Sequence, residues 1–520
     1  MSSFSICRWR GNFLIAVLVS FLSGVTWLSI RSSDGSTQEP RSGFVWRKSQ
    51  PVSRVVALSQ ATSSSPPTEQ IQKSWLHLPL RTWVSRLNPP HLLDVRKQVI
   101  GQRGYGPSMP SKHQRLVYNP DNKRVYFYSG DYPGPPFQSS FHTDMFSYDI
   151  TKSVSSDPSD FQNWILEWPY CGLAGQISPV ATDEAPFTWD SKRRIFWVTG
   201  GWEVSGQDVV KMCGNGAVFY GSSARTSANP QGNAPHGPDI LQFDPRQNRY
   251  IRPDAKFKLP NVAVDQYGRS VMGGGQTPRH SVYNPVTDEI IMMGQGTCGV
   301  EVMRMNAETG AWTRDCDAKG NNPNAGDAMD GKYINDAQPL HEQLALDVEH
   351  QWIYWIDTYH KQNPDSNHRF RLMRYNIKGR NMITLGWIRL PDFGDPLKFP
   401  FYMAPYDSTM LAYDSINKVV LWPASSNEGR PILMIYHPDP AGRKNGRWEV
   451  DPMSRDKPNE IIVGSNGTFI PELNVLVIYG GFGTPHSDFF AGHPGIQAPA
   501  RYFWLYRYGN GLSESSEHPK

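Results

Sequence analysis

The chain has 520 residues, of which 38% are hydrophobic and 12% aromatic, enough to bury a large core and to exclude wholesale disorder. Its 52 basic and 48 acidic residues leave a net charge of +4, which is too balanced to indicate a surface for nucleic acid. The 45 glycines and 43 prolines predict frequent turns, and frequent turns are typical of chains with many short strands.

The first predicted element is an apolar segment at residues 13–30, which follows a short tail at residues 1–12. A helix of about 18 residues just spans a bilayer core. Because Arg8 and Arg10 precede the segment, we expect an uncleaved, single-pass type II membrane anchor with a cytoplasmic tail and an extracytoplasmic or lumenal remainder. The alternative is a cleaved signal peptide and a secreted protein, although residues 22–24 fit the small-residue cleavage rule poorly.

Two segments outside the predicted folded domain lack apolar periodicity. Residues 31–72 are rich in Ser, Thr, Pro and Gln, which predicts a disordered stem between the anchor and the domain. Residues 511–520 form a polar tail that we also expect to be disordered. The folded domain is therefore expected at residues 73–510.

Within this domain a pair of short apolar strands joined by a tight turn recurs six times. The turn starts with Asn or Asp in all copies but the last, and the turns begin at Asn119, Asp190, Asn284, Asp347, Asp414 and Pro471. The second strands open at Val125, Ile195, Ile290, Trp352, Val419 and Val475. Each copy continues with a third strand, a polar turn and often a fourth strand that bears Trp.

Four antiparallel strands per unit predict an all-β, six-bladed propeller, or a seven-bladed one if residues 81–112 hold a degenerate copy. The last copy ends after its third strand. We expect residues 74–80 to supply the missing outer strand and so to remove an open sheet edge.

The repeated tyrosine and Asn/Asp turn, the paired glycines and the downstream tryptophan are similar to kelch repeats, which also build the central domain of galactose oxidase. The glycine pairs are Gly200-Gly201 and Gly480-Gly481, and the tryptophans are Trp312 and Trp448. The resemblance covers nearly all of the chain after residue 73. It implies a kelch-type propeller but not an activity, because kelch propellers include enzymes, adaptors and lectin-like binders.

Antiparallel strands reverse direction at every connection, so the connections alternate between the two ends of a propeller. The turns between first and second strands, and between third and fourth, are short and meet at one end. The long connections meet at the other end, and they comprise residues 131–144, 202–238, 358–369 and 484–501 with the junctions 171–184, 316–340 and 391–407. We expect the function at this long-loop end.

Four of the five cysteines fall at the predicted long-loop end, whereas Cys7 precedes the anchor. Outside the cytoplasm, four cysteines allow three disulfide pairings. We favour Cys171–Cys213 and Cys298–Cys316, with free thiols as the alternative. A structural zinc site would need a close C-x-x-C spacing, which is absent.

Several histidines and charged residues lie at or near the start of first strands, namely His113, Arg115, Arg279, His280, His341 and Glu342. Around a channel mouth they would bind an anionic sugar or carry out acid–base chemistry. The alternative is a structural role, in which the side chains form hydrogen bonds with loop backbone between blades.

The galactose oxidase resemblance raises a copper radical site, which needs two tyrosines, one of them joined to a cysteine, and two histidines. Tyr170-Cys171 and Arg279-His280 are similar to parts of that pattern. The family's last histidine comes from a domain after the propeller, and no such domain follows here. We therefore expect no copper and no other cofactor.

The long loops hold two more candidates for ligand contact, Trp202 and His486. His486 lies near His493, and His142 lies in another loop, but neither loop has a known metal-ligand spacing, so we expect no metal site. The sequence predicts a propeller that binds a glycan or a protein at its long-loop end. The alternative is an enzyme that acts on a saccharide or a similar polar metabolite at the channel mouth. In either case, alanine at Trp202 or His280 is expected to impair function with little loss of stability.

Overall fold

The computed structural model describes residues 78, 80–81, 84–86, 115–128, 144–152, 163–169, 172–180, 186–198, 217–221, 240–253, 257, 280–296, 299–315, 343–357, 370–391, 410–425, 431–444, 446–452, 466–479 and 503–509, all within the compact unit Ser65–Lys520. The predicted anchor, stem and C-terminal tail lie outside the described residues. In the part of the chain that is described, no helix is long and apolar enough to span a bilayer.

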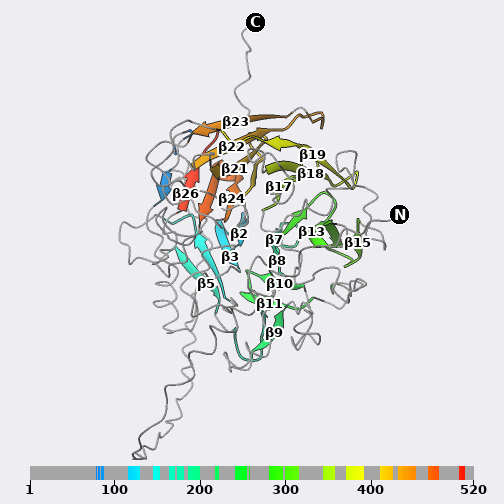
Figure 1. The fold of residues 1–520 in the computed structure, drawn as a ribbon. Helices are drawn as coiled ribbons and strands as arrows, with labels where there is room; N and C mark the ends of the chain where they lie inside the picture. The colour runs from blue at the N-terminus through cyan, green and yellow to red at the C-terminus, as the bar shows by residue number, and fades with distance from the viewer. Residues whose placement is uncertain are drawn as a thin grey trace, which may run out of the picture. The chain divides into compact units, whose positions relative to one another are not determined.

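The described strands form six four-stranded antiparallel sheets, which we number in chain order (Figure 1). The first sheet contains β2 (Arg115–Asn119), β3 (Arg124–Tyr128), β4 (Met145–Asp149) and β5 (Trp164–Trp168). The second contains β7 (Phe187–Asp190), β8 (Ile195–Val198), β10 (Leu241–Asp244) and β11 (Arg249–Ile251). The third contains β12 (His280–Asn284), β13 (Glu289–Gly296), β14 (Gly299–Asn306) and β15 (Trp312–Arg314).

The remaining sheets repeat this meander. The fourth contains β16 (Ala345–Asp347), β17 (Trp352–Asp357), β18 (Phe370–Asn376) and β19 (Asn381–Ile388). The fifth contains β20 (Ala412–Asp414), β21 (Val419–Ser425), β22 (Pro431–His437) and β23 (Arg447–Pro452). The sixth contains β24 (Asn466–Ile470), β25 (Val475–Tyr479), β26 (Phe503–Tyr506) and, as its outer strand, β1 (Val84–Arg86).

The six sheets close into a ring. First strands contact one another in the order β12, β7, β2, β24, β20 and β16. Six hydrophobic clusters fill the ring, one at each junction between neighbouring sheets. Figure 1 shows the sheets arranged around a common centre. The prediction of an all-β, six-bladed propeller is confirmed.

The alternation of side chains explains why the second strands are continuously apolar. In β3, Val125 and Phe127 pack toward the sixth sheet, whereas Tyr126 and Tyr128 pack toward the second. Successive residues of a strand point to opposite faces, and here both faces are buried between neighbouring sheets. The apolar runs in the sequence are therefore strands sandwiched between two blades.

Each sheet uses the same tight turn between its first and second strands. The leading Asn or Asp accepts hydrogen bonds from backbone amides two or three residues later, as in Asp190 with Lys192 and Arg193 at 3.0 and 2.9 Å. Six residues at the ends of these turns have positive φ, namely Lys123, Arg194, Asp288, Gln351, Lys418 and Asn474. The last turn is a short 3₁₀ helix, Pro471–Leu473, which replaces the Asn/Asp side chain.

The strand that closes the ring is displaced from its predicted position. An N-terminal segment does complete the sixth sheet, but β1 is Val84–Arg86, which pairs antiparallel with β26, rather than residues 74–80. Of the predicted segment the structure describes Leu78 and Leu80. Leu80 makes an isolated parallel bridge with Arg507, and Leu78 is buried in the core between the sixth and first sheets.

A two-stranded parallel sheet lies outside the six blades and was not predicted. It pairs β6 (Ile177–Val180), from the junction after the first sheet, with β9 (Val218–Gly221), from the long connection inside the second. The Trp168 indole of β5 donates to Ser178 Oγ at 2.9 Å, which ties this extra sheet to the first blade.

Candidate functional site

The end of the propeller that carries the tight turns, here called the turn face, has a polar contact across every junction between neighbouring sheets. In ring order the contacts are Asp121–Arg194 (2.5 Å), Arg193–Asp288 (2.6 Å), Asn284–Gln351 (2.6 Å), Glu349–Lys418 (2.5 Å), Asn417–Asn474 (3.1 Å) and Glu472–Lys123 (2.9 Å). Three of the six pairs, Asp121–Arg194, Glu349–Lys418 and Glu472–Lys123, are exposed, so each of these alone contributes little to stability. Together the six pairs use the polar side chains of this face to join the blades.

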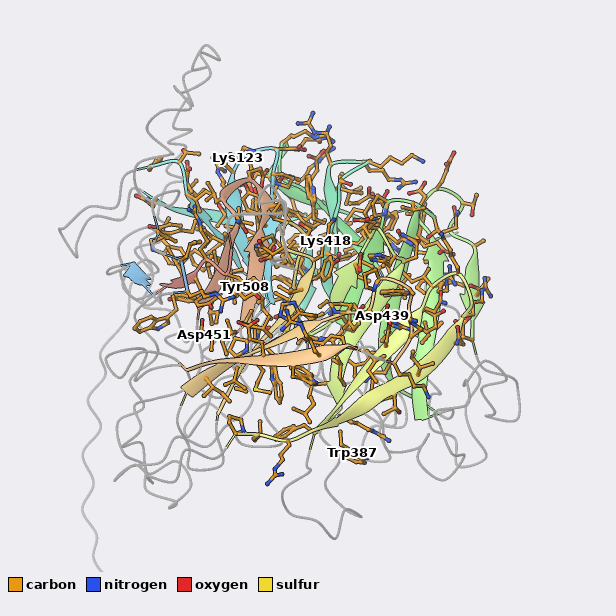
Figure 2. All side chains as sticks on the ribbon, turned by 90° about the horizontal axis from the view of Figure 1, so that it is seen from above. Lys123, Trp387, Lys418, Asp439, Asp451 and Tyr508 are labelled. Atoms are coloured by element: carbon orange, nitrogen blue, oxygen red, sulfur yellow. The ribbon has the colours of Figure 1, made fainter. Side chains whose placement is uncertain are left out.

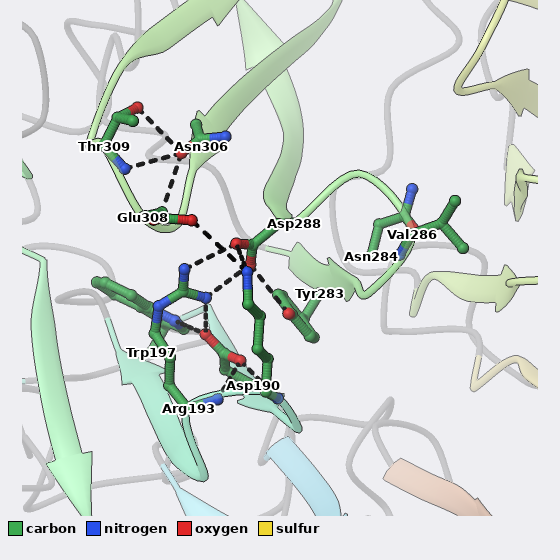
Figure 3. A network of polar contacts seen from close by, with 11 residues as sticks. Asp190, Arg193, Trp197, Tyr283, Asn284, Val286, Asp288, Asn306, Glu308 and Thr309 are labelled. Atoms are coloured by element: carbon green, nitrogen blue, oxygen red, sulfur yellow. Dashed lines mark hydrogen bonds and ion pairs between the residues drawn. The ribbon is translucent and has the colours of Figure 1, made fainter.

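The strongest of these contacts joins the second and third sheets (Figure 3). Arg193 Nη1 and Nη2 donate to Asp288 Oδ1 and Oδ2 at 2.6 and 2.8 Å, and Tyr283 donates to Asp288 at 3.0 Å. Asp190 binds the same guanidinium at 2.9 Å. Hydrogen bonds from Arg193 hold the pKa of Asp288 well below its usual value. This geometry is built to join blades rather than to bind a ligand.

The opposite, long-loop end carries the connections between second and third strands and between sheets. Two of these connections are short, residues 297–298 between β13 and β14 and residues 426–430 between β21 and β22. The long connections between second and third strands therefore belong to the first, second, fourth and sixth blades.

At the long-loop end, buried polar side chains from non-neighbouring blades meet inside the ring. Arg115 opens β2 of the first sheet, His280 opens β12 of the third and Asn466 opens β24 of the sixth. Arg115 Nη2 lies 3.3 Å from His280 Nε2, and Arg115 Nη1 donates to Asn466 Oδ1 at 3.3 Å. The first and third sheets are not neighbours, so the contact between Arg115 and His280 crosses the channel.

A second contact also crosses the channel, from the fourth sheet to the sixth. Gln343, just before β16, donates from Nε2 to the Gly467 carbonyl at 2.6 Å. A Cβ at Gly467 would lie 2.4 Å from the Val477 carbonyl oxygen and 2.5 Å from Met410 Cε, so the close approach of the backbone requires glycine. We call Arg115, His280, Gln343, Asn466 and Gly467 the channel floor.

The chemistry of the floor follows from its donors and acceptors. A guanidinium only donates, so in a hydrogen bond between Arg115 and His280 it is the imidazole Nε2 that accepts. The side chain of Asn466 is 2% exposed, and its Nδ2 has no hydrogen-bond partner in the part of the chain that the structure describes. A buried amide donor of this kind indicates a place for a water or a ligand acceptor.

The structure brings together two of the residues that the sequence singled out, Arg115 and His280. The other predicted site residues, His113, Trp202, Arg279, His341, Glu342 and His486, lie outside the described residues, as do Cys171, Cys213, Cys298 and Cys316. Gln343 and Asn466 were not among the residues that the sequence singled out. Both residues stand at the start of first strands, the position that had drawn attention to the histidines.

The described residues contain no group of three or more His, Cys, Asp or Glu side chains that could hold a metal ion. His280 is engaged with Arg115, which does not match the ligand set of a copper radical site.

No family model matches the chain, and no curated protein matches it. Solved structures similar to it include Kuenenia stuttgartiensis hydrazine synthase, with 8% identity, a TM-score of 0.36 and coverage of 73% of this chain and 76% of that one. The SapL1 lectin in complex with alpha methyl fucoside has 11% identity, a TM-score of 0.35 and coverage of 72% and 89%. A nidogen/laminin complex has 9% identity, a TM-score of 0.33 and coverage of 65% and 83%.

Similarity at this level transfers no ligand, partner or activity. The class of the protein rests on its own sheet topology, which makes it a six-bladed β-propeller.

Proposed function

We propose that this protein is a non-catalytic, glycan-binding propeller of the kelch type, whose ligand reaches the channel floor from the long-loop end. The observation that carries the proposal is the buried Nδ2 donor of Asn466 beside the Arg115 guanidinium. Leaving a buried donor unpaired costs about 1–3 kcal/mol. A sugar hydroxyl or carboxylate supplies the acceptor that relieves this cost.

The contrast between the two ends of the propeller supports this location. Polar side chains of the turn face bind one another across all six junctions, and tight turns leave that end little room for variation. At the other end, cross-channel contacts build a base of amide and guanidinium groups on strand ends, which are rigid positions for a binding site.

The geometry of His280 favours binding over catalysis. A general acid or base has to exchange a proton with the substrate. His280 Nε2 accepts from Arg115, and protonating it would bring two cations together in a buried place. An enzyme acting on a saccharide at this site would need another acid–base group.

The type II membrane anchor at residues 13–30 is part of the same proposal, and it rests on the length and apolar composition of that segment and on Arg8 and Arg10 before it. In the propeller, strand β26 runs from the long-loop end to the turn face, and β1 runs antiparallel to it.

The test uses the full-length chain, solubilised in detergent, on an array of neutral and acidic glycans. In Asn466→Asp the oxygen that accepts from Arg115 is kept and the spare donor is removed, so the fold is retained and glycan binding falls by about tenfold, the effect of about 1.4 kcal/mol. The matched control is Asn306→Asp in a turn-face hairpin, where the side-chain oxygen only accepts. Its glycan binding is expected to equal that of the wild type.

Three outcomes would overturn the proposal. Equal glycan binding by N466D and the wild type would show that the channel floor is not part of the glycan-binding site. Absence of glycan binding alongside a saturable protein partner would make the propeller a protein-binding module. Turnover of a bound saccharide would make it an enzyme.

A further inference from the structure

The ring has one seam where a distant part of the chain completes a sheet. The closing segment, described here at Leu78, Leu80, Arg81 and Val84–Arg86, adds only a three-residue strand to the sixth sheet. On one side of that sheet Leu78 is buried between the sixth and first blades. On the other side Arg81 reaches the fifth blade, where Arg81 Nη1 lies 2.5 Å from Glu449 Oε1.

Glu449, on the outer strand β23, is the centre of this second attachment. Its Oε2 accepts from His437 Nε2 and from the Tyr508 hydroxyl, each at 2.9 Å, while Oε1 accepts from Arg81. Arg81 also lies over the Tyr508 ring, 4.8 Å from its centroid. Every partner of this carboxylate donates to it, so the arrangement depends on Glu449 being ionised.

Other charged and titratable groups face Glu449 from each neighbouring element. Arg447, also on β23, lies 4.0 Å from Glu449 and 3.5 Å from His437 Nδ1. Asp451 on the same strand accepts from Tyr506 of β26, and Arg507 donates to the Leu473 carbonyl at 3.1 Å. Figure 2 labels Asp451 and Tyr508, two of the residues at this seam.

We propose that Glu449 is an acid-operated latch, whose protonation frees Arg81 and loosens the closing segment while the six blades stay folded. A protonated carboxyl group is neutral and keeps one acceptor oxygen, so the charge attraction between Glu449 and Arg81 is lost and at most a neutral hydrogen bond remains. Arg81 is therefore the partner whose attachment weakens. The closing segment is then held by the backbone hydrogen bond from Arg81 N to the Arg507 carbonyl at 2.7 Å and by the three residue pairs of β1 with β26.

The signs of the pKa shifts agree with an acid-labile seam. Burial acts to raise the pKa of Glu449, but hydrogen bonds from His437 and Tyr508 and the charge of Arg81 outweigh it, so the pKa is lowered from 4.5. A carboxylate with a lowered folded pKa stabilises the closed state above about pH 4.5 and loses that effect as the pH falls through the folded value.

Two neighbouring groups have opposite effects on the stability of the closed seam as the pH falls. Burial lowers the pKa of His437 from 6.5, so its closed, neutral state loses stability as the pH falls below that value. Burial raises the pKa of Asp451 from 3.8, so its protonation in acid relieves a cost and opposes opening. Tyr508, with a pKa raised to about 12, stays neutral throughout.

The test is hydrogen exchange of the full-length chain between pH 7 and pH 3, corrected for the intrinsic rate. In the wild type, peptides covering residues 78–86 are expected to exchange about tenfold faster at pH 3, while strand β13 keeps its protection. In Glu449→Gln the side chain is neutral, and its NH2 group, a donor, faces side chains that also donate. This variant should therefore show the fast exchange already at pH 7. The matched control, Glu349→Gln, breaks an exposed ion pair on the turn face and should follow the wild type.

Arg81→Gln tests the same latch from the other side, at a half-exposed residue whose replacement leaves the core untouched. It should loosen the closing segment at every pH and abolish most of the pH dependence. Wild-type protection of residues 78–86 that is unchanged down to pH 3 would overturn the proposal. So would E449Q protection equal to the wild type at pH 7, or a loss of protection in acid that is shared equally with β13.

Discussion

Arg193 of the second blade binds both carboxylate oxygens of Asp288 in the third, at 2.6 and 2.8 Å, and Asp288 adopts a positive φ of 55° at the end of its turn. A bidentate pair of this kind fixes direction as well as distance. It is the firmest of the contacts that join neighbouring blades across the turn face.

Asp288→Asn should lower the free energy of unfolding by about 1–3 kcal/mol, because one arm of the bidentate pair and the charge that attracts Arg193 and Lys192 are lost. The control is Asp121→Asn, which weakens a more exposed pair with Arg194 and should cost less than about 1 kcal/mol. Urea denaturation of both variants measures the difference. Equal losses would show that the bidentate geometry adds nothing.

The same contact predicts how stability depends on pH. Arg193 holds the pKa of Asp288 below the ordinary 3.8, so its stabilising effect is complete above about pH 4 and is lost as the pH falls toward the folded value. The unfolding free energy of the wild type should drop between pH 4 and pH 2.5 more steeply than that of D288N. Parallel curves for the two proteins would assign the acid sensitivity to other groups.

His280→Ala should lower stability by about 1–3 kcal/mol, because it removes the acceptor of a buried guanidinium and leaves a void in the channel floor. This reverses the expectation from the sequence, in which His280 was a channel-mouth residue whose loss leaves stability nearly unchanged. Lys123→Glu, at an exposed turn-face residue, serves as the comparison and should cost less than about 1 kcal/mol. Thermal melts of the two variants give the order.

The position of β1 changes the truncation that should break the propeller. Removing residues 1–77 should leave a soluble folded protein, because the described closing segment begins at Leu78. Removing residues 1–86 deletes β1 and exposes the edge of β26, so aggregation or unfolding is expected. Size-exclusion chromatography distinguishes these results, and two equally stable truncations would argue against closure by this strand.

The Cys171–Cys213 disulfide stays a prediction from the sequence. Both cysteines lie outside the described residues, six and five positions before Ile177 and Val218, which pair in the parallel sheet of β6 and β9. Peptide mapping of non-reduced, alkylated protein should find the 171–213 bridge. Thiols that are alkylated at both positions would contradict it and would favour a reducing compartment.

Much of the fold was predictable because the signals were local. A turn that starts with Asn or Asp needs only its own side chain to bond the next amides, so Asn119, Asp190 and Asp414 marked the hairpins directly. Apolar runs followed each turn because β3 and its equivalents are buried on both faces. Repetition then gave the number of blades.

The identity of the closing strand was not predictable from the same signals. Residues 74–80 have the stronger apolar pattern, but Leu78 uses it to anchor in a core between two blades, and Val84–Arg86 makes the sheet pairing. A strand of three residues has no distinctive sequence pattern. Whether it pairs depends on which strand edge of the folded sheet is open beside it.

The sequence alone determined a six-fold repeat of four-stranded units, since turn chemistry and strand periodicity act over a few residues. Only the tertiary structure decided that Arg115 meets His280 across the channel, that Gln343 reaches Gly467 and that Arg81 meets Glu449 at the seam. The two residues of each pair are 165, 124 and 368 positions apart in the sequence. The arrangement of the six blades in a ring brings these residues together. A local sequence pattern does not identify which residues of another blade they will contact.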